Sequence, residues 1–506
     1  MASEPLRAPT ADARIDRDAG VRVGRNFSFR VASQVINSII NVIGMVLLGN
    51  ALNASDYGGY AFYYALVSLI SSLADGGVGI IITREISRDV TSGPRLLGDG
   101  LMVKSAISAA IMLLVLVIGF STLDPARAAL LALVTATALV DFSQDSSVWV
   151  LRAHERLNLE AVLLILSQVI WLGALALAVT MKAGLPVLLG AASFAFLVRM
   201  VVGAVIVSRL FYRPVFRPDF GRLRGLLLQG LPFGLAMFGV VLYGRIGLLT
   251  LKALSTPADV AYYNVSYLLS QPFGFIASAL SIAAFPMLSR HASGDERRLR
   301  RVIRRTYRFQ VLLTPPMTVG LFLLAEPIVA ILFHKGTLQP AAAGLRIMSL
   351  ALMMIFLNVT SRYVLTAIDR QGAYLRSIVA GLIASVVLGL LLVPPLGFRG
   401  ACYATIGGEL AICIVCQRAL SRYLTAGNVL EDLVRPVIAA VGMGLVVFAL
   451  RGIHLGLVVA VGCATYFALL LLIQGISSDD LKAVGRLYSS LRLPGAKPVP
   501  RAELHF

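Results

Sequence analysis

This 506-residue chain is poor in the residues on which most enzyme active sites depend. It has only 5 histidines, and its 4 cysteines all lie in predicted hydrophobic spans, without disulfide or metal-ligand spacing. The G-x-x-x-x-G-K-[ST], H-E-x-x-H and G-x-S-x-G motifs of nucleotide-binding, zinc and hydrolase sites do not occur. We therefore expect a protein that is not an enzyme, with no catalytic residue, no cofactor and no metal.

Acidic residues are also scarce, with 26 Asp and Glu against 45 Lys and Arg, a net charge of +19. The chain is 58% hydrophobic and its mean hydropathy is +0.83, which excludes a soluble fold. About fourteen apolar segments, each near 20 residues long, can cross a ~30 Å hydrocarbon core as helices. The sequence thus predicts an all-α integral membrane protein with about fourteen transmembrane helices.

Positive charge alternates between the gaps that separate these segments. With a cytoplasmic N-terminus, the cytoplasmic gaps hold 36 of the 45 Lys and Arg, and the opposite side holds 7. The other two, Arg199 and Arg245, lie inside spans. This bias predicts a multi-pass membrane protein with both termini in the cytoplasm. Because the charges sit beside spans, we expect membrane lipids and not nucleic acid as their partners.

An internal repeat relates the two halves of the chain. "LLGNALNASDYGGYAFYYAL" and "LLTLKALSTPADVAYYNVSYLL" align Asp56 with Asp259 and Tyr60 with Tyr263, an offset of 203. Six spans lie between the copies, so the repeat is parallel and predicts two six-helix lobes with a cleft between them. The expected divisions are a basic cytoplasmic N-terminus (1–30), an N-lobe of helices 1–6 (31–208), a cytoplasmic linker (209–230), a C-lobe of helices 7–12 (231–421), helices 13–14 (434–474) and a cytoplasmic tail (475–506).

Ionisable side chains at membrane depth are the candidate site residues, because burying them is costly unless they are paired or hydrated. Arg245 lies ~20 Å along its helix from the cytoplasmic start, too deep to reach that side easily. A guanidinium suits a phosphate, because its planar fork matches the oxygens and stays charged. A salt bridge within the membrane, or extension toward the outer face, is the structural alternative for Arg245.

The remaining candidates lie closer to the cytoplasmic side. Asp141 and Asp145 share a helix face, where they can contact sugar hydroxyls, shuttle a proton or pair with Arg152. Asp75 sits among glycines that permit close helix approach. Arg199 can act as an anchor at the membrane interface instead of binding substrate. The same alternative holds for Arg30, at the start of the first span. The predicted substrate-binding set is Arg245, Arg199, Asp75, Asp141, Asp145 and Arg30.

Eight arginines lie in the segment "SRHASGDERRLRRVIRRTYR", residues 289–308. Its pattern indicates either an amphipathic helix on the inner leaflet or a solvated loop that only sets topology.

Several phrases resemble one known family. "LLGNALNASDYGGYAF" and "LADGGVGIIITREISRD" are similar to the opening of polysaccharide exporters and Wzx-type O-antigen flippases, in the MATE-like multidrug/oligosaccharidyl-lipid/polysaccharide superfamily. "GRIGLLTLKALSTPADVAYYNVSYLL", "AAFPMLSR" and "VPPLGFRGACYATIGGEL" follow in the family's order. The resemblance implies flipping of undecaprenyl-diphosphate-linked oligosaccharide across the bacterial inner (cell) membrane, by alternating access around a cationic cavity. Many relatives carry an acid immediately before the arginine of helix seven, where this chain has Gly244.

We also expect a lipid-linked oligosaccharide as substrate, a monomeric state, and a polysaccharide polymerase and glycosyltransferases as partners. A MATE-type cation-coupled drug antiporter is less well supported, because "VASQVINSIINVIGMVLLG" in helix one lacks the usual acid. A lipid II flippase usually has more basic residues in its cavity than the one or two expected here. A membrane-embedded glycosyltransferase would need a large outer loop, and every outer loop here is short.

Overall fold

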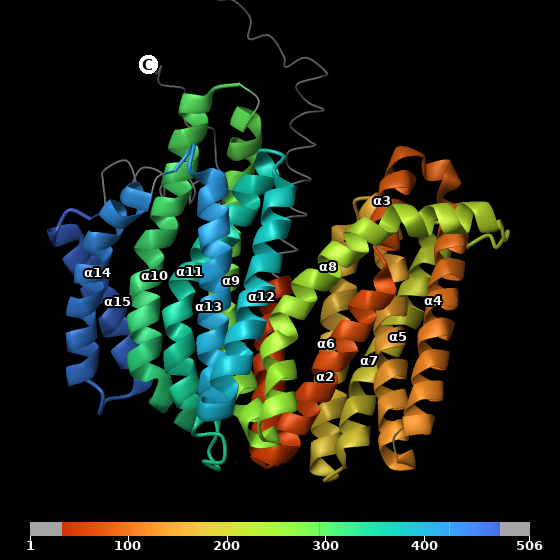
Figure 1. Ribbon diagram of the computed structural model, residues 1–506, viewed down its shortest axis with the longest axis horizontal. Helices are drawn as coiled ribbons and strands as arrows, with labels where there is room; N and C mark the ends of the chain where they lie inside the picture. The colour runs from red at the N-terminus through yellow and green to blue at the C-terminus, as the bar shows by residue number, and fades with distance from the viewer. Residues whose placement is uncertain (1–32, 123, 293, 425, 476–506) are drawn as a thin grey trace, which may run out of the picture.

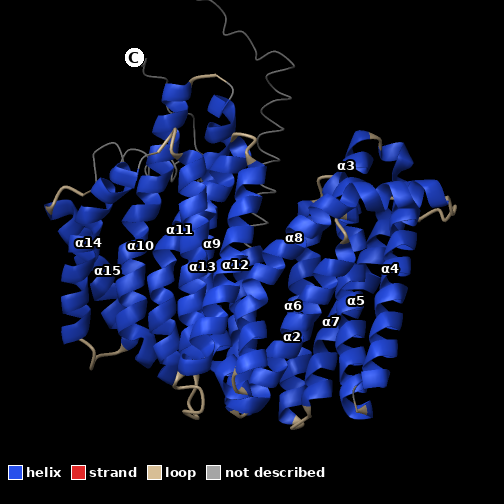
Figure 2. Ribbon diagram, viewed as in Figure 1, coloured by secondary structure: helices blue, strands red, loops and turns tan. Residues whose placement is uncertain are grey.

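The computed structural model describes residues 33–122, 124–292, 294–424 and 426–475, and these form helices joined by short turns (Figure 2). No β-strand occurs within these ranges. Thirteen of the helices are long and apolar enough to cross a membrane, and a bent pair, α2 and α3, makes up a further span. The prediction of an all-α membrane protein with about fourteen spans is confirmed.

The spans follow one another in the order expected from hydropathy. After a first helix, Ser33–Ala51, the elements are α2 (Ala54–Asp75), α3 (Val78–Arg88), η1 (Val90–Ser92), α4 (Gly93–Thr122), α5 (Pro125–Ala153), α6 (Leu157–Thr180), α7 (Leu185–Leu210), α8 (Phe220–Leu254), α9 (Pro257–Ala292), α10 (Glu296–Leu332), α11 (Ala341–Ala367), α12 (Gln371–Leu396), α13 (Phe398–Leu420), α14 (Ala426–Ala449) and α15 (Leu455–Leu472).

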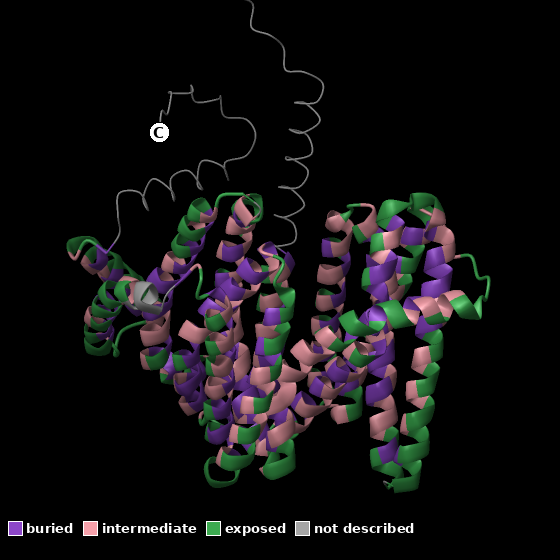
Figure 3. Cartoon of the chain, turned by 45° about the horizontal axis from the view of Figure 1, so that its top comes forward, coloured by how far each residue is buried: buried purple, intermediate pink, exposed green. Residues whose placement is uncertain are grey.

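Two helix bundles lie side by side in Figure 1. α2–α7 form one bundle, which we call the N-lobe, and α8–α13 form the other, the C-lobe. The first helix lies at their junction, with Gly44 against Trp171 of α6 and Gly49 against Phe333. α14 and α15 pack against α10 at the edge of the C-lobe. Exposed residues line the outer sides of both bundles (Figure 3), and many of them are apolar; on α4, for example, Leu113 and Val117 are 63% and 60% exposed. Such exposure is favourable in hydrocarbon and costly in water.

α8 connects the lobes because its two halves pack on different partners. Its first half lies against α3 and α4, where Arg222 forms an ion pair with the fully buried Asp99 at 2.9 Å. Its second half packs against α2, α9, α12 and α13.

The break between α2 and α3 is also a contact with α8. The two helices meet at 48°, and Gly76 and Gly77 have φ of +53° and +72°, a left-handed conformation that favours glycine. A β-carbon on Gly77 would lie 2.2 Å from the backbone oxygen of Gly230. Backbone therefore meets backbone here, and a larger residue at 77 would separate α8 from the N-lobe.

The lobes are joined at the end of the molecule that carries few arginines, at the bottom of Figure 1. One hydrophobic cluster there includes Leu48, Tyr57, Ala261, Phe333 and Leu345 from both lobes. The helices of the two bundles diverge toward the opposite, arginine-rich end (Figure 1). The lobe contacts outside α8 thus concentrate at the arginine-poor end.

Side-chain hydrogen bonds hold this junction together. Asn50 Nδ2 donates to the Leu332 carbonyl at 2.7 Å, and the His334 amide donates to Asn50 Oδ1 at 3.0 Å. Tyr57 and Asn264 bond across the α2–α9 contact at 3.2 Å.

The arginine-rich segment 289–308 differs from the prediction. It is neither a separate surface helix nor a long loop, because α9 runs to Ala292 and α10 begins at Glu296. Leu299 and Ile303, on its apolar face, are buried against the ends of neighbouring helices. With 37 residues, α10 is ~55 Å long at 1.5 Å per residue, well beyond a ~30 Å core. The arginines therefore lie on a helical hairpin that projects past the membrane.

Candidate functional site

Arg245 lies on the second half of α8, where α8 passes α2. Its Nε donates to Ser68 Oγ at 3.1 Å, and its side chain is half-buried. Within the part of the chain that the structure describes, it forms no ion pair with a carboxylate. The two terminal nitrogens keep their donors, because only Nε is used. A cation without an anion at this depth needs water or an anionic ligand.

Two glycines on α8 allow tyrosines of α9 to come close to Arg245. The Tyr267 hydroxyl lies 3.6 Å from the β-carbon position of Gly244, and the Tyr263 hydroxyl would lie 2.3 Å from a β-carbon on Gly247. Both tyrosines are within electrostatic range of the Arg245 guanidinium. Gly244 thus adjoins Tyr267, and no acid stands directly before Arg245 to neutralise its charge.

One face of α2 leads from Arg245 into the N-lobe. It carries Tyr64, Ser68, Ser71 and Asp75, whose spacings of four, three and four residues place them on the same side of a helix. Tyr64 lies within electrostatic range of both Arg245 and Asp141, and Ser71 lies near Asp141. This polar face connects the two groups of charges.

Four predicted residues come together at the end of this face. Arg199 on α7 lies 3.7 Å from Asp145 on α5. Gln144 donates to Asp141, and Asp75 interacts electrostatically with Asp145. Asp145 is 51% exposed, and an exposed carboxylate at membrane depth requires water rather than lipid around it.

Arg152, the alternative partner for Asp141 and Asp145, is engaged elsewhere. It binds both oxygens of Glu160, with a shortest distance of 2.7 Å. Arg30 lies outside the described residues.

Lys104 belongs to the same cluster and was not predicted. It is 3% exposed, and its ammonium donates to the Phe142 carbonyl and lies 4.1 and 4.2 Å from the centres of the Phe142 and Trp149 rings. It interacts electrostatically with the three N-lobe aspartates. The sequence placed it near the cytoplasmic start of a span, from where it could reach water. α4 instead begins at Gly93, so Lys104 lies ~17 Å along the helix.

The C-lobe contributes one acid at membrane depth, Glu409 on α13. It accepts hydrogen bonds from the Tyr243 hydroxyl and from Asn358 Nδ2, each at 2.8 Å. Both side chains that bind this carboxyl are neutral. Glu326, near the arginine-poor end, pairs with Arg346 at 2.9 Å and has a structural role there.

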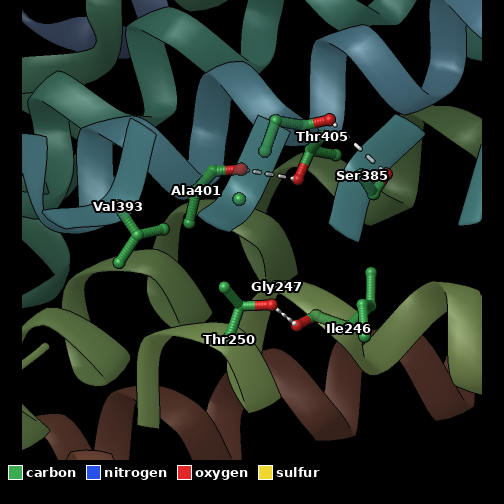
Figure 4. Close-up of a pocket in the computed structure, with 9 residues that line it drawn as sticks. Ile246, Gly247, Thr250, Ser385, Val393, Ala401 and Thr405 are labelled. Carbon is green, nitrogen blue, oxygen red and sulfur yellow. Dashed lines mark hydrogen bonds between the residues drawn. The ribbon is translucent and has the colours of Figure 1, made fainter. Parts of the chain in front are cut away.

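A small cavity opens on the opposite side of α8 from Ser68, between α8, α12 and α13 (Figure 4). Its volume is about 10 Å³, room for about one water molecule. The hydroxyls that line it are bonded to backbone: Thr250 donates to Ile246 and Thr405 to Ala401, each at 2.9 Å. It is too small for a phosphate or a sugar, so it is not the substrate site.

The fold defines the class of protein. The structure matches one described as "Lipid II flippase MurJ, inward closed conformation" with a TM-score of 0.73, 14% identity, and coverage of 88% of this chain and 98% of that one. It matches an inward-facing multidrug resistance MATE family transporter of the MOP superfamily with a TM-score of 0.62, 14% identity, and coverage of 76% and 95%. At these identities the likeness shows the fold alone, which is that of MOP-superfamily transporters.

Sequence comparison then gives the family. The family described as "Polysaccharide biosynthesis protein" matches residues 23–292, and "Lipid II flippase MurJ" matches residues 159–469. The probable low-salt glycan biosynthesis flippase Agl15 of Haloferax volcanii is 20% identical over 74% of this chain and 78% of its own length. The probable lipid II flippase MurJ of Bdellovibrio bacteriovorus is 23% identical over 44% of each chain. The chain belongs to the polysaccharide biosynthesis protein family, and its family matches support a flippase of lipid-linked glycan precursors.

Proposed function

We propose that this protein flips an undecaprenyl-diphosphate-linked oligosaccharide across the bacterial inner membrane, for the assembly of a polysaccharide, O-antigen or exopolysaccharide. The observation that carries the proposal is Arg245, a guanidinium at membrane depth whose terminal nitrogens bind no carboxylate in the described residues. A diphosphate is the part of such a substrate that most needs a cation, because transferring its charge into a low dielectric is costly.

Alternating access is the mechanism we infer. The positive-inside bias supports a cytoplasmic location for the arginine-rich end and for both termini. In that orientation the lobes are joined at the outer end and diverge toward the cytoplasm, which supports an inward-facing state ready to receive substrate. Transport then requires the outer contacts of Asn50 and Tyr57 to open.

Each group of polar residues has a role in this proposal. Arg245 binds the diphosphate, while the lipid tail stays in the bilayer. Asp75, Asp141 and Asp145 accept hydrogen bonds from sugar hydroxyls, and Arg199 and Lys104 balance the charge of these carboxylates. Arg30 stays a predicted contributor from the N-terminal side. We infer a monomer that works with a polymerase and glycosyltransferases and that moves its substrate without chemical change.

Replacing Arg245 tests the proposal in cells. Arg245→Ala should abolish export of the polymer while the membrane level of the protein stays normal, and Arg245→Lys should restore only part of it, because lysine lacks the bidentate fork. Arg346→Ala is the matched control: it also removes a membrane arginine, but one paired with Glu326 near the arginine-poor end. Normal export by Arg245→Ala would remove Arg245 from the transport path.

Lipid II is the second candidate substrate, because the lipid II flippase family matches residues 159–469. The buried Lys104 adds a third cation to Arg199 and Arg245 and weakens the sequence argument against it. Purified protein in vesicles, given fluorescent lipid II or a fluorescent lipid-linked oligosaccharide, distinguishes the two. We expect faster flipping of the oligosaccharide; faster flipping of lipid II would reassign the substrate.

A further inference from the structure

The sequence repeat is visible in the structure as two matching pairs of tyrosines. On α2, Tyr60 and Tyr64 stack with ring centres 5.9 Å apart and planes at 17°. On α9, Tyr263 and Tyr267 stack at 6.0 Å and 16°. The pairs are related by the offset of 203 that relates the two halves of the chain. Equal geometry at equivalent positions indicates that both pairs belong to one pseudo-symmetric arrangement.

The second tyrosine of each pair lies beside Arg245. Tyr64 is one turn before Ser68, the hydrogen-bond partner of Arg245, and on the same face of α2. The Tyr267 hydroxyl lies 3.6 Å from the β-carbon position of Gly244, next to Arg245 in the chain. Both are half-buried and both interact electrostatically with the guanidinium. Arg245 is thus flanked by a tyrosine from each lobe.

The first tyrosine of each pair is committed elsewhere. Tyr263 bonds to Thr405 at 3.0 Å, and Tyr60 is buried in the cluster that joins the lobes. Because each ring of a pair covers a face of the other, sugar stacking on the shared faces is blocked. What Tyr64 and Tyr267 offer near Arg245 is therefore a hydroxyl donor.

We propose that the Tyr64 and Tyr267 hydroxyls are two further donors of the Arg245 site, and that this arrangement selects a diphosphate over a monophosphate. The proposal rests on the function proposed above, because it assumes that Arg245 receives the anion. A diphosphate has two phosphate groups, so the guanidinium can bond to both while each tyrosine donates to one. A monophosphate fills half of such a site.

Because the two tyrosines come from different lobes, a bound diphosphate would also link the lobes. Tyr64 belongs to the N-lobe and Tyr267 to the C-lobe, while Arg245 bonds to Ser68 of α2 and follows Gly244, whose β-carbon position lies 3.6 Å from the Tyr267 hydroxyl of α9. A diphosphate held by both tyrosines would stabilise the lobes in one relative position. Release then follows when the lobes rearrange and one hydroxyl is lost.

Binding by the full-length purified protein in detergent tests the proposal, with farnesyl diphosphate and farnesyl monophosphate as probes and calorimetry as readout. We expect the diphosphate to bind at least about tenfold more tightly than the monophosphate. Tyr64→Phe and Tyr267→Phe should each weaken diphosphate binding about tenfold, the effect of one hydrogen bond to a charged group, and change monophosphate binding less than diphosphate binding. Both variants keep the rings and their stacking.

Tyr60→Phe and Tyr262→Phe are the controls, since they remove hydroxyls from neighbouring positions on the same helices, and both should bind like the wild type. If Arg245→Ala abolishes binding of both probes but the two phenylalanine variants bind like the wild type, the tyrosine proposal fails and the function of Arg245 stands. If Arg245→Ala binds both probes normally, the proposed function fails as well. Equal wild-type affinity for the two probes would overturn diphosphate selection.

Discussion

The two lobes share a repeat but use polar residues in different ways. In the N-lobe, Asp75, Lys104, Asp141, Asp145 and Arg199 form a group of charges with an exposed carboxylate. The C-lobe interior is held mostly by neutral hydrogen bonds and one acid. The hydrogen bonds of the C-lobe interior include Tyr307 to Ser361 at 2.7 Å, Gln310 to Ser281 at 3.2 Å, Ser281 to Thr360 at 3.2 Å, and the two bonds to Glu409.

This difference suggests a division of labour. Neutral hydrogen bonds that are satisfied within the protein make a packed scaffold. Charges that are only loosely paired leave capacity for a ligand, which is what the N-lobe retains. The C-lobe would then hold Arg245 in place, and the N-lobe would present the polar face along which the glycan moves.

Among substitutions that test this difference between the lobes, removal of the buried Lys104 should have the largest effect on flipping. Lys104→Met keeps the length of the side chain but leaves Asp75, Asp141 and Asp145 with less counter-charge and the Phe142 carbonyl without its donor. We expect flipping by reconstituted protein to fall at least about tenfold, and stability to fall by about 1–3 kcal/mol, because a buried acceptor loses its charged hydrogen-bond partner. Lys252→Met, an exposed lysine near the arginine-poor end, is the control. Normal flipping by Lys104→Met would show that the N-lobe charges need no internal cation.

The next largest effect, a loss of stability, is expected from a substitution at the glycine contact between the N-lobe and α8. Gly77→Ala forces a β-carbon to 2.2 Å from Gly230 O and also strains the backbone at φ +72°. We expect a loss of about 3 kcal/mol or more in stability, measured by unfolding in detergent. Gly76→Ala has similar strain at φ +53° but nothing within 3.7 Å, so it should lose only ~1 kcal/mol. Equal losses for the two variants would mean that the contact with α8 contributes nothing.

Glu409→Gln tests the scaffold role of the C-lobe acid. The amide can keep contacts with both Tyr243 and Asn358, so stability should change by less than ~1.5 kcal/mol. Flipping should stay above about half of the wild-type rate in the reconstituted assay. Loss of flipping with unchanged stability would instead assign Glu409 to transport and erase the contrast between the lobes.

The smallest effect on stability is expected at the exposed ion pair. Asp145 and Arg199 are 3.7 Å apart and Asp145 is half exposed, so Asp145→Asn should alter the free energy of unfolding by less than ~1 kcal/mol. Denaturation in detergent measures this directly. A much larger loss would show that the pair is structural and would remove Asp145 from the candidate site.

Much of the fold could be predicted from the sequence, because membrane helices follow hydropathy and charge closely. The spans, their order and the tyrosine pairs related by an offset of 203 could all be predicted from the sequence. The break at Gly76 and Gly77 was not, because hydropathy carries no information on positive φ. The extension of α10 was missed because its buried face, Leu299 and Ile303, has the spacing of a surface helix.

The residues of the candidate site could be predicted from the sequence where their depth within a membrane span alone identifies them. Asp75, Asp141, Asp145 and Arg199 were singled out as charges in spans, and the structure brings them together. Lys104 was missed because its depth depends on where α4 begins. That Arg152 binds Glu160 depends on the packing of α5 and α6, and nothing in the local sequence favoured Glu160 over the aspartates.

The central claim is that Arg245 binds the anionic headgroup during transport. The most direct measurement is the flipping rate of a fluorescent undecaprenyl-diphosphate oligosaccharide in vesicles that contain equal amounts of wild-type protein or Arg245→Ala. We predict that Arg245→Ala flips no faster than protein-free vesicles. A rate equal to that of the wild type would contradict the account.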